Sequence, residues 1–165
     1  MQPRLLALVL LLIAPGLSAC GFTPLYATPG VSPGLSAIET IAPEGRTGFL
    51  LGEALNDVLA RDPARPPMWR LTMDLKETRT PRGRRVDATA SRYELVLTAD
   101  WKLLNTATGA VALEGTTTTE ATFDRADQPY AGIVANQDAQ SRAASELARK
   151  IQLQLAVWIA NGAGG

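Results

Sequence analysis

The segment RYELVLTADWKL, Arg92–Leu103, carries the clearest periodicity in this chain of 165 residues. Apolar residues occupy every second position, and polar residues fill most of the positions between them. A β-strand places successive side chains on opposite faces, so the alternation predicts a strand with one buried and one solvated face. The predicted buried face consists of Tyr93, Leu95, Leu97, Ala99, Trp101 and Leu103.

Similar segments lie on both sides of this strand. Upstream, Trp69–Lys76 alternates with the same period of two. Downstream, Asn105–Gly109 has the composition of a hairpin turn, and Val111–Phe123 continues as a long strand rich in β-branched threonine. A weaker alternation over Leu35–Ile41 predicts one more short strand. Together the segments predict an antiparallel sheet with one apolar face, which needs a cover.

Two amphipathic helices are predicted to supply that cover. The first begins near Thr47, a good capping residue, and ends before Asp62-Pro63. The last helix is predicted to start between Tyr130 and Gln137, to run to about Ala160, and to bury one stripe of side chains. That stripe consists of Ala144, Leu147, Ala148, Ile151, Leu155, Trp158 and Ile159.

The sequence therefore predicts an α+β fold. It is a small, mostly antiparallel sheet of about four strands with two helices packed on one face, in the order β-α-β-β-β-α. The domain spans residues 35–160, and residues 161–165 form a short tail. The preceding residues 20–34 contain three prolines and several glycines, so they are predicted to be an extended tether without a helix.

Two residues of the last helix depart from its pattern. Leu153 and Val157 project toward the polar side. They either belong to a helix end that is buried all round, or they form an apolar contact surface for a partner. Burial of both within the monomer would exclude the partner surface.

The N-terminus has the organisation of an export signal. Arg4 is followed by ten uncharged residues, Leu5–Ala14, too few for a membrane-spanning helix. Leu17-Ser18-Ala19-Cys20 then resembles the lipobox of bacterial lipoproteins, so residues 1–19 are predicted to be removed and Cys20 to carry a diacylglycerol and an N-linked acyl chain. The alternative is an ordinary signal peptide with an incidental cysteine. Gly21, where inner-membrane lipoproteins commonly have aspartate, favours the outer membrane.

The composition excludes several kinds of chemistry. The chain has no histidine and one cysteine, so it has no Ser-His-Asp site, no Cys-His site and no internal disulfide. No metal and no cofactor other than the covalent lipid is expected. Asp124 and Asp127 are the one candidate acid pair, but no base or nucleophile is placed beside them. We therefore expect no enzymatic activity.

Two motifs resemble a known family. The opening CGFTPLY, Cys20–Tyr26, and the helical segment YAGIVANQDAQSRAASELA, Tyr130–Ala148, are similar to the lipopolysaccharide-assembly lipoproteins of the LptE family. The resemblance implies a lipid-anchored protein on the periplasmic side of the outer membrane. It implies that the protein plugs and helps assemble the β-barrel partner LptD and binds lipopolysaccharide in transit. An auxiliary lipoprotein of another lipid transporter is the alternative.

A basic segment is the candidate lipopolysaccharide site. Arg79–Arg85 contains four arginines, and its Pro81 and Gly83 predict a turn that places the charges at a hairpin tip. Lipid A carries phosphates, which arginine binds through two parallel hydrogen bonds. A solvated loop, or one paired with acids in the barrel, is the alternative. Nucleic acid is not expected as a partner of an exported lipoprotein. The predicted contacts are Arg79, Arg82, Arg84 and Arg85.

Overall fold

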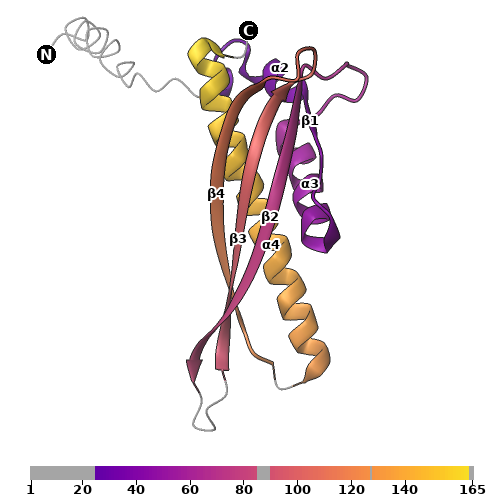
Figure 1. Ribbon diagram of the computed structural model, residues 1–165. Coiled ribbons are helices and arrows are strands. Elements are labelled where there is room, and N and C mark those ends of the chain that lie inside the picture. Colours follow the sequence, from indigo (N-terminus) through magenta and orange to yellow (C-terminus); the bar gives the residue numbers. More distant parts are fainter. Residues whose placement is uncertain (1–24, 85–89, 127, 164–165) are drawn as a thin grey trace, which may run out of the picture.

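The computed structural model describes residues 25–84, 90–126 and 128–163. The sheet consists of β1 (Ile38–Thr40), β2 (Trp69–Arg84), β3 (Ala90–Asn105) and β4 (Val111–Asp124). The helices are α2 (Val31–Ser36), α3 (Gly45–Leu59) and α4 (Pro129–Trp158), with short turns η2 (Leu25–Ala27) and η3 (Ile159–Ala163) near the ends. Figure 1 shows long strands running the length of the molecule, with α4 crossing behind them.

The four strands lie in the order β1-β2-β3-β4. β2, β3 and β4 form two antiparallel hairpins, whereas β1 pairs with β2 in parallel. The parallel pair arises because α3 connects β1 to β2 and returns the chain to the end where β1 began. The predicted α+β fold is confirmed, with a mixed rather than purely antiparallel sheet.

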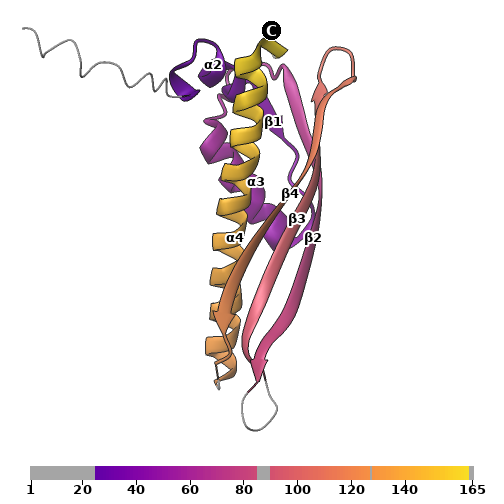
Figure 2. The same ribbon diagram turned by 90° about the vertical axis from the view of Figure 1, so that its left-hand side faces the viewer.

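The core lies between the sheet and the two long helices, which Figure 2 shows on the same side of the sheet. The alternation predicted for β3 is confirmed at its centre, where Leu95, Leu97 and Leu103 are fully buried. The predicted stripe of α4 is likewise buried from Ala144 to Leu155. Figure 1 places α2, the β3–β4 turn and the end of α4 at one end of the molecule. The free end of the β2–β3 hairpin and the start of α4 lie at the other.

The prediction of a helix-free tether up to residue 34 is wrong, because α2 spans Val31–Ser36. Gly30 precedes it with a φ of 91°, a backbone conformation that glycine adopts without strain. Pro33 lies in the first turn, where backbone N–H groups have no partner within the helix, so proline costs little there. Val31 and Leu35, one helical turn apart, are 0% and 3% exposed and join the core. The strand predicted for Leu35–Ile41 is therefore reduced to β1.

The outer edge of β4 is covered by side chains of α4. Arg142 donates from Nη2 to the backbone oxygen of Thr122 at 3.2 Å. Lys150 donates from Nζ to the backbone oxygen of Thr118 at 3.0 Å. The two cations are eight residues apart on the helix, and the two carbonyls are four residues apart on the strand. Both intervals span about 12–13 Å, so the spacing of the cations matches that of the outward carbonyls. Charged side chains that occupy an edge in this way prevent another strand from pairing with it.

Candidate functional site

The basic segment is part of β2 rather than a turn, which corrects the prediction from Pro81 and Gly83. Backbone pairs continue through Pro81–Tyr93 and Arg82–Arg92 to Arg84–Ala90. Leu71 directs its carbonyl to the β1 side, where it accepts from Ile41 N at 2.9 Å. Pro81 is ten residues further along the strand, an even number, so its backbone groups point to the same edge as those of Leu71. Proline has no N–H, but at this position the N–H would not have bonded to β3, so no hydrogen bond of the hairpin is lost. The arginines still lie near the free end of the β2–β3 hairpin, but on its strands rather than in its turn.

The strand alternation separates the arginines onto two faces. Arg79 is on the face that carries the core, and its guanidinium carbon lies 5.7 Å from the centre of the Tyr93 ring. Tyr93 in turn stacks on Phe123, with ring centroids 5.5 Å apart. A guanidinium over an aromatic ring gains a cation–π attraction. Its N–H donors lie in the plane of the guanidinium and remain available for hydrogen bonds.

Arg82 is on the opposite, solvated face, directly across from Arg92 of β3. Each has an acidic partner. Arg82 donates from Nε to Glu94 at 2.7 Å, and Arg92 donates from Nε to Asp124 at 2.8 Å. Arg82, Gly83, Arg92 and Asp124 line an open hollow of about 470 Å³. Two like charges that face each other across a strand pair repel, and the two acids relieve that repulsion.

These ion pairs leave the arginines able to bind an anion. The side chains of Arg82 and Arg92 are 60% and 55% exposed. An exposed ion pair is weak in water, so a phosphate can join these pairs and can replace the carboxylate of Asp124, which is 72% exposed, at small cost. The hydrogen bond that Arg92 donates to Asp124, and then the Coulomb attraction of that carboxylate, raise the pKa of Arg92 above its ordinary value. Arg92 is therefore cationic at every physiological pH.

Several predicted residues lie wholly or partly outside the part of the chain that the structure describes. Cys20, Arg85 and Asp127 lie outside the described residues, and only the backbone of Arg84 is described. Asp124, half of the candidate acid pair, is the ion-pair partner of Arg92. Within the described ranges, no three acidic or sulfur-bearing side chains come together as a metal site would require.

The sequence analysis missed Arg92, which was assigned only to the polar side of its strand. The signal was the hairpin register. Once Trp69 is paired with Asn105, counting along both strands brings Arg82 opposite Arg92. The register between β3 and β4, which has an irregularity between Leu103 and Leu104, places Tyr93 beside Phe123.

The helical motif resembling the LptE family joins α4 to the rest of the fold. Gln140 donates from Nε2 to both carboxylate oxygens of Glu77 on β2, at 3.1 Å each. Thr47 of α3 donates from Oγ1 to the same carboxylate at 2.7 Å. Asp138 orients Arg142, at 2.8 Å, toward the β4 edge. Three elements thus meet at Glu77, where α3 begins to cover the sheet.

We expect Glu77→Ala to lower the free energy of unfolding by about 1–2 kcal/mol, since it removes hydrogen bonds to a charged acceptor from Thr47 and Gln140. Glu77→Gln keeps an acceptor and should cost less. Urea titration followed by tryptophan fluorescence measures both. Equal stability of the wild type and Glu77→Ala would show that this junction does not hold the helices.

Apolar side chains are exposed at both ends of α4. Leu153 and Val157 are 51% and 45% exposed, so the monomer does not bury them. At the other end, Tyr130, Ile133 and Val134 are exposed. Ile133 is fourteen residues, or about four turns, before Leu147 and lies on the same helix face. It is uncovered because α4 extends beyond the first turn of α3, which lies beside Gln140.

None of the described helices combines the length and the apolar character needed to cross a membrane. Although α4 has 30 residues, its middle carries five charged side chains, Asp138, Arg142, Glu146, Arg149 and Lys150.

Comparison with solved structures finds related folds. A lipoprotein from Caulobacter crescentus CB15 is 50% identical, covers 81% of this chain and 97% of its own, and superposes with a TM-score of 0.71. Lipoprotein B from Nitrosomonas europaea has a TM-score of 0.57 at 15% identity, covering 76% of this chain and 84% of its own. A minor lipoprotein from Acinetobacter baumannii has a TM-score of 0.53 at 14% identity, covering 73% and 88%. The last two similarities concern the fold alone.

A search of curated proteins gives no match to this chain. The family model described as LptE, lipopolysaccharide-assembly, matches residues 35–155, from the end of α2 into the last turn of α4. This range includes the whole sheet, α3, all but the last three residues of α4, and the junction at Glu77. The chain therefore belongs to the LptE family of lipopolysaccharide-assembly lipoproteins.

Proposed function

We propose that this protein is an outer-membrane lipoprotein, acylated at Cys20 and facing the periplasm, that plugs and helps assemble an LptD β-barrel and binds lipopolysaccharide during its transfer to the outer leaflet. The role involves no catalysis. The protein acts by surface complementarity and by electrostatic capture of phosphate.

The observation that carries the proposal is the position of the basic hairpin end. The chain enters the described structure at Leu25, near α2, whereas Arg79, Arg82 and Arg92 lie at the opposite end. With 30 residues, α4 alone spans about 45 Å between these ends. A lipid anchor at one end and an anion site at the other suit a protein that is held at one membrane surface and meets an anionic lipid at a distance.

The chemistry of the hairpin end fits lipid A. Two outward arginines face each other across the hairpin, one paired with half-buried Glu94 and the other with exposed Asp124. Arg79 stands over an aromatic pair on the other face. Uncovered Ile133 and Val134 lie at the same end of the molecule. Phosphates and acyl chains in one ligand match this combination of cations and apolar surface.

A barrel partner also fits the exposed surfaces. The outer face of the sheet is polar and none of the described helices covers it, and Leu153 and Val157 add an apolar patch on α4. Purification of the tagged protein from its native outer membrane in mild detergent, followed by mass spectrometry, tests this role. We expect a large β-barrel of the LptD type at near one-to-one ratio. A preparation that brings inner-membrane transporter subunits and no such barrel would contradict the proposal.

A matched pair of variants locates the barrel contact. We expect Leu153→Ser together with Val157→Ser to lower the yield of co-purified barrel. Ile133→Ser together with Val134→Ser, at the other end of the same helix, should lower the yield of barrel less. Both pairs start from exposed positions, so neither should unfold the monomer. Barrel yield unaffected by the Leu153 and Val157 changes would exclude this patch as a barrel contact.

A further inference from the structure

The end of the domain nearest Cys20 carries a surface that the proposed function does not use. Tyr26, Met68 and Val111 are 45%, 56% and 50% exposed. They belong to η2, the loop before β2, and the start of β4. Single exposed apolar residues are ordinary, but three at one end of a long molecule need an explanation.

Hydrogen bonds hold these segments together. Ser32 of α2 donates from Oγ to the backbone oxygen of Tyr26 at 3.3 Å. The backbone N–H of Met68 donates to Ala37, just after α2, at 3.0 Å. Thr106, in the β3–β4 turn, donates from Oγ1 to the backbone oxygen of Met68 at 3.0 Å. Tyr26 and Met68 therefore lie on segments that hydrogen bonds tie to α2 and to the β3–β4 turn, and Val111 follows that turn.

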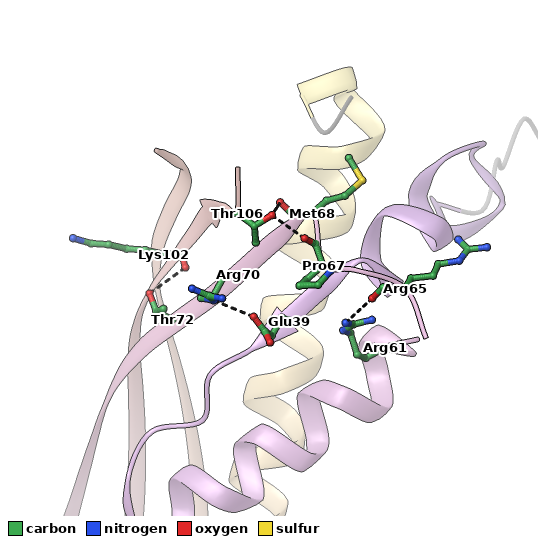
Figure 3. Close-up of polar contacts among 9 residues, drawn as sticks. All are labelled: Glu39, Arg61, Arg65, Pro67, Met68, Arg70, Thr72, Lys102 and Thr106. Atoms are coloured by element: carbon green, nitrogen blue, oxygen red, sulfur yellow. Dashed lines mark hydrogen bonds and ion pairs between the residues drawn. The ribbon is translucent and has the colours of Figure 1, made fainter. Parts of the chain in front are cut away.

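Basic side chains lie beside them in the loop after α3. Arg61 donates from Nη2 to the backbone oxygen of Arg65 at 2.9 Å, and Asp62 accepts from the backbone N–H of Ala64 at 3.0 Å. This network shapes the loop and leaves the Arg65 side chain 64% exposed. Figure 3 shows Arg65 projecting away from the loop and Met68 beside Pro67 and Thr106.

Chain length brings this end to a membrane. Leu25 is five residues after Cys20, and a fully extended chain spans at most about 3.3–3.6 Å per residue, or about 18 Å in all. The far end of the molecule is about 45 Å away along α4. With its acyl chains in a bilayer, the protein must keep the end containing Tyr26 near the lipid headgroups.

We propose that this end rests on the bilayer surface, with Tyr26, Met68 and Val111 among the lipid headgroups and Arg65 against their phosphates. The inference rests on the proposed acylation of Cys20. Tyrosine suits the interface because its ring is apolar and its hydroxyl is polar. An arginine near an anionic bilayer surface is attracted by the lipid phosphates.

Single cysteine labels test the contact, because Cys20 is the only cysteine and acylation consumes its thiol. Acylated full-length mature protein would carry Met68→Cys, Val111→Cys or Val134→Cys, each labelled with the environment-sensitive dye NBD. Val111 and Val134 form a matched pair, since they are 50% and 46% exposed at opposite ends. The proteins would be reconstituted into vesicles of phosphatidylethanolamine and phosphatidylglycerol, and flotation would verify membrane attachment.

We expect several-fold brighter, blue-shifted emission from the labels at 68 and 111, with quenching by headgroup spin-labelled lipid. The label at position 134 should keep the weak, unshifted emission of a dye in water. Vesicle-bound protein with aqueous emission at 68 and 111 would overturn the contact while leaving the anchor intact. Shifts of equal size at all three positions would mean that the molecule lies flat, and would also overturn it. Protein that does not float with the vesicles would refute the acylation and this inference together.

Discussion

Gly48→Ala should lower the free energy of unfolding by about 2 kcal/mol or more. Gly48 is buried in α3, and a Cβ atom there would lie 2.2 Å from the backbone oxygen of Pro43 and 2.7 Å from its carbonyl carbon. Backbone atoms cannot rotate away as a side-chain end can, so either α3 or the segment before it must move. Overpacking costs about 1–3 kcal/mol and occasionally more, and a clash with backbone belongs at the upper end of that range, whereas the helix propensity of alanine returns at most about 1 kcal/mol.

Gly132→Ala is the matched control, because Gly132 is also helical and a Cβ atom there meets nothing within 4 Å. That variant should gain about 0.5–1 kcal/mol from helix propensity alone. Urea unfolding followed by tryptophan fluorescence should therefore shift in opposite directions for the two substitutions. Shifts of the same sign would mean that α3 does not pack as closely on the Pro43 segment as described.

Alanine at Arg79, Arg82, Arg84 and Arg85 should weaken binding of lipopolysaccharide more than about tenfold. A hydrogen bond to a charged group contributes about 1.5–3 kcal/mol, and about 1.4 kcal/mol corresponds to a factor of ten in affinity. The loss of one arginine–phosphate contact is thus enough to be seen. Folding should persist, because Arg82 is 60% exposed and the ion pair of an exposed side chain contributes little.

Binding is measured with purified lipopolysaccharide at fixed ionic strength, since exposed charges are screened by salt. Arg70→Ala together with Arg149→Ala removes exposed arginines away from the hairpin end, and should leave affinity within about twofold. Arg92→Ala alone should also weaken binding, because Arg92 completes the outward pair. Unchanged affinity in the four-residue variant would refute phosphate capture by the hairpin.

The parts of the fold with strong periodicity were predictable. The alternation of β3 and the stripe of α4 both depend on one side of an element being buried, and that burial selects the residue types directly. Where the local composition argued against an element, the prediction was wrong. α2 forms despite Pro33 because the first turn of a helix needs no N–H donor there. β2 continues through Pro81 because that residue faces the open edge.

The candidate site was predictable only in part. The arginine-rich composition identified the hairpin end, but composition carries no register, and register decides which charges share a face. Arg79 and Arg82 are therefore on opposite faces, and Arg92 joins Arg82 from another strand. The junction at Glu77 is also invisible to periodicity, since Thr47, Glu77 and Gln140 are widely separated in the chain and each is unremarkable alone.

The covering of the β4 edge by Arg142 and Lys150 has a consequence for the time before the protein is complete. α4 follows β4 in the chain. A polypeptide delivered from its N-terminus therefore forms the local β2–β3 and β3–β4 hairpins before α4 is present to cover the β4 edge. During that interval an unprotected, threonine-rich strand is available to a neighbouring chain. A polypeptide stalled or cleaved after β4 would keep that strand exposed, and its fate would be self-association rather than slow completion of the fold.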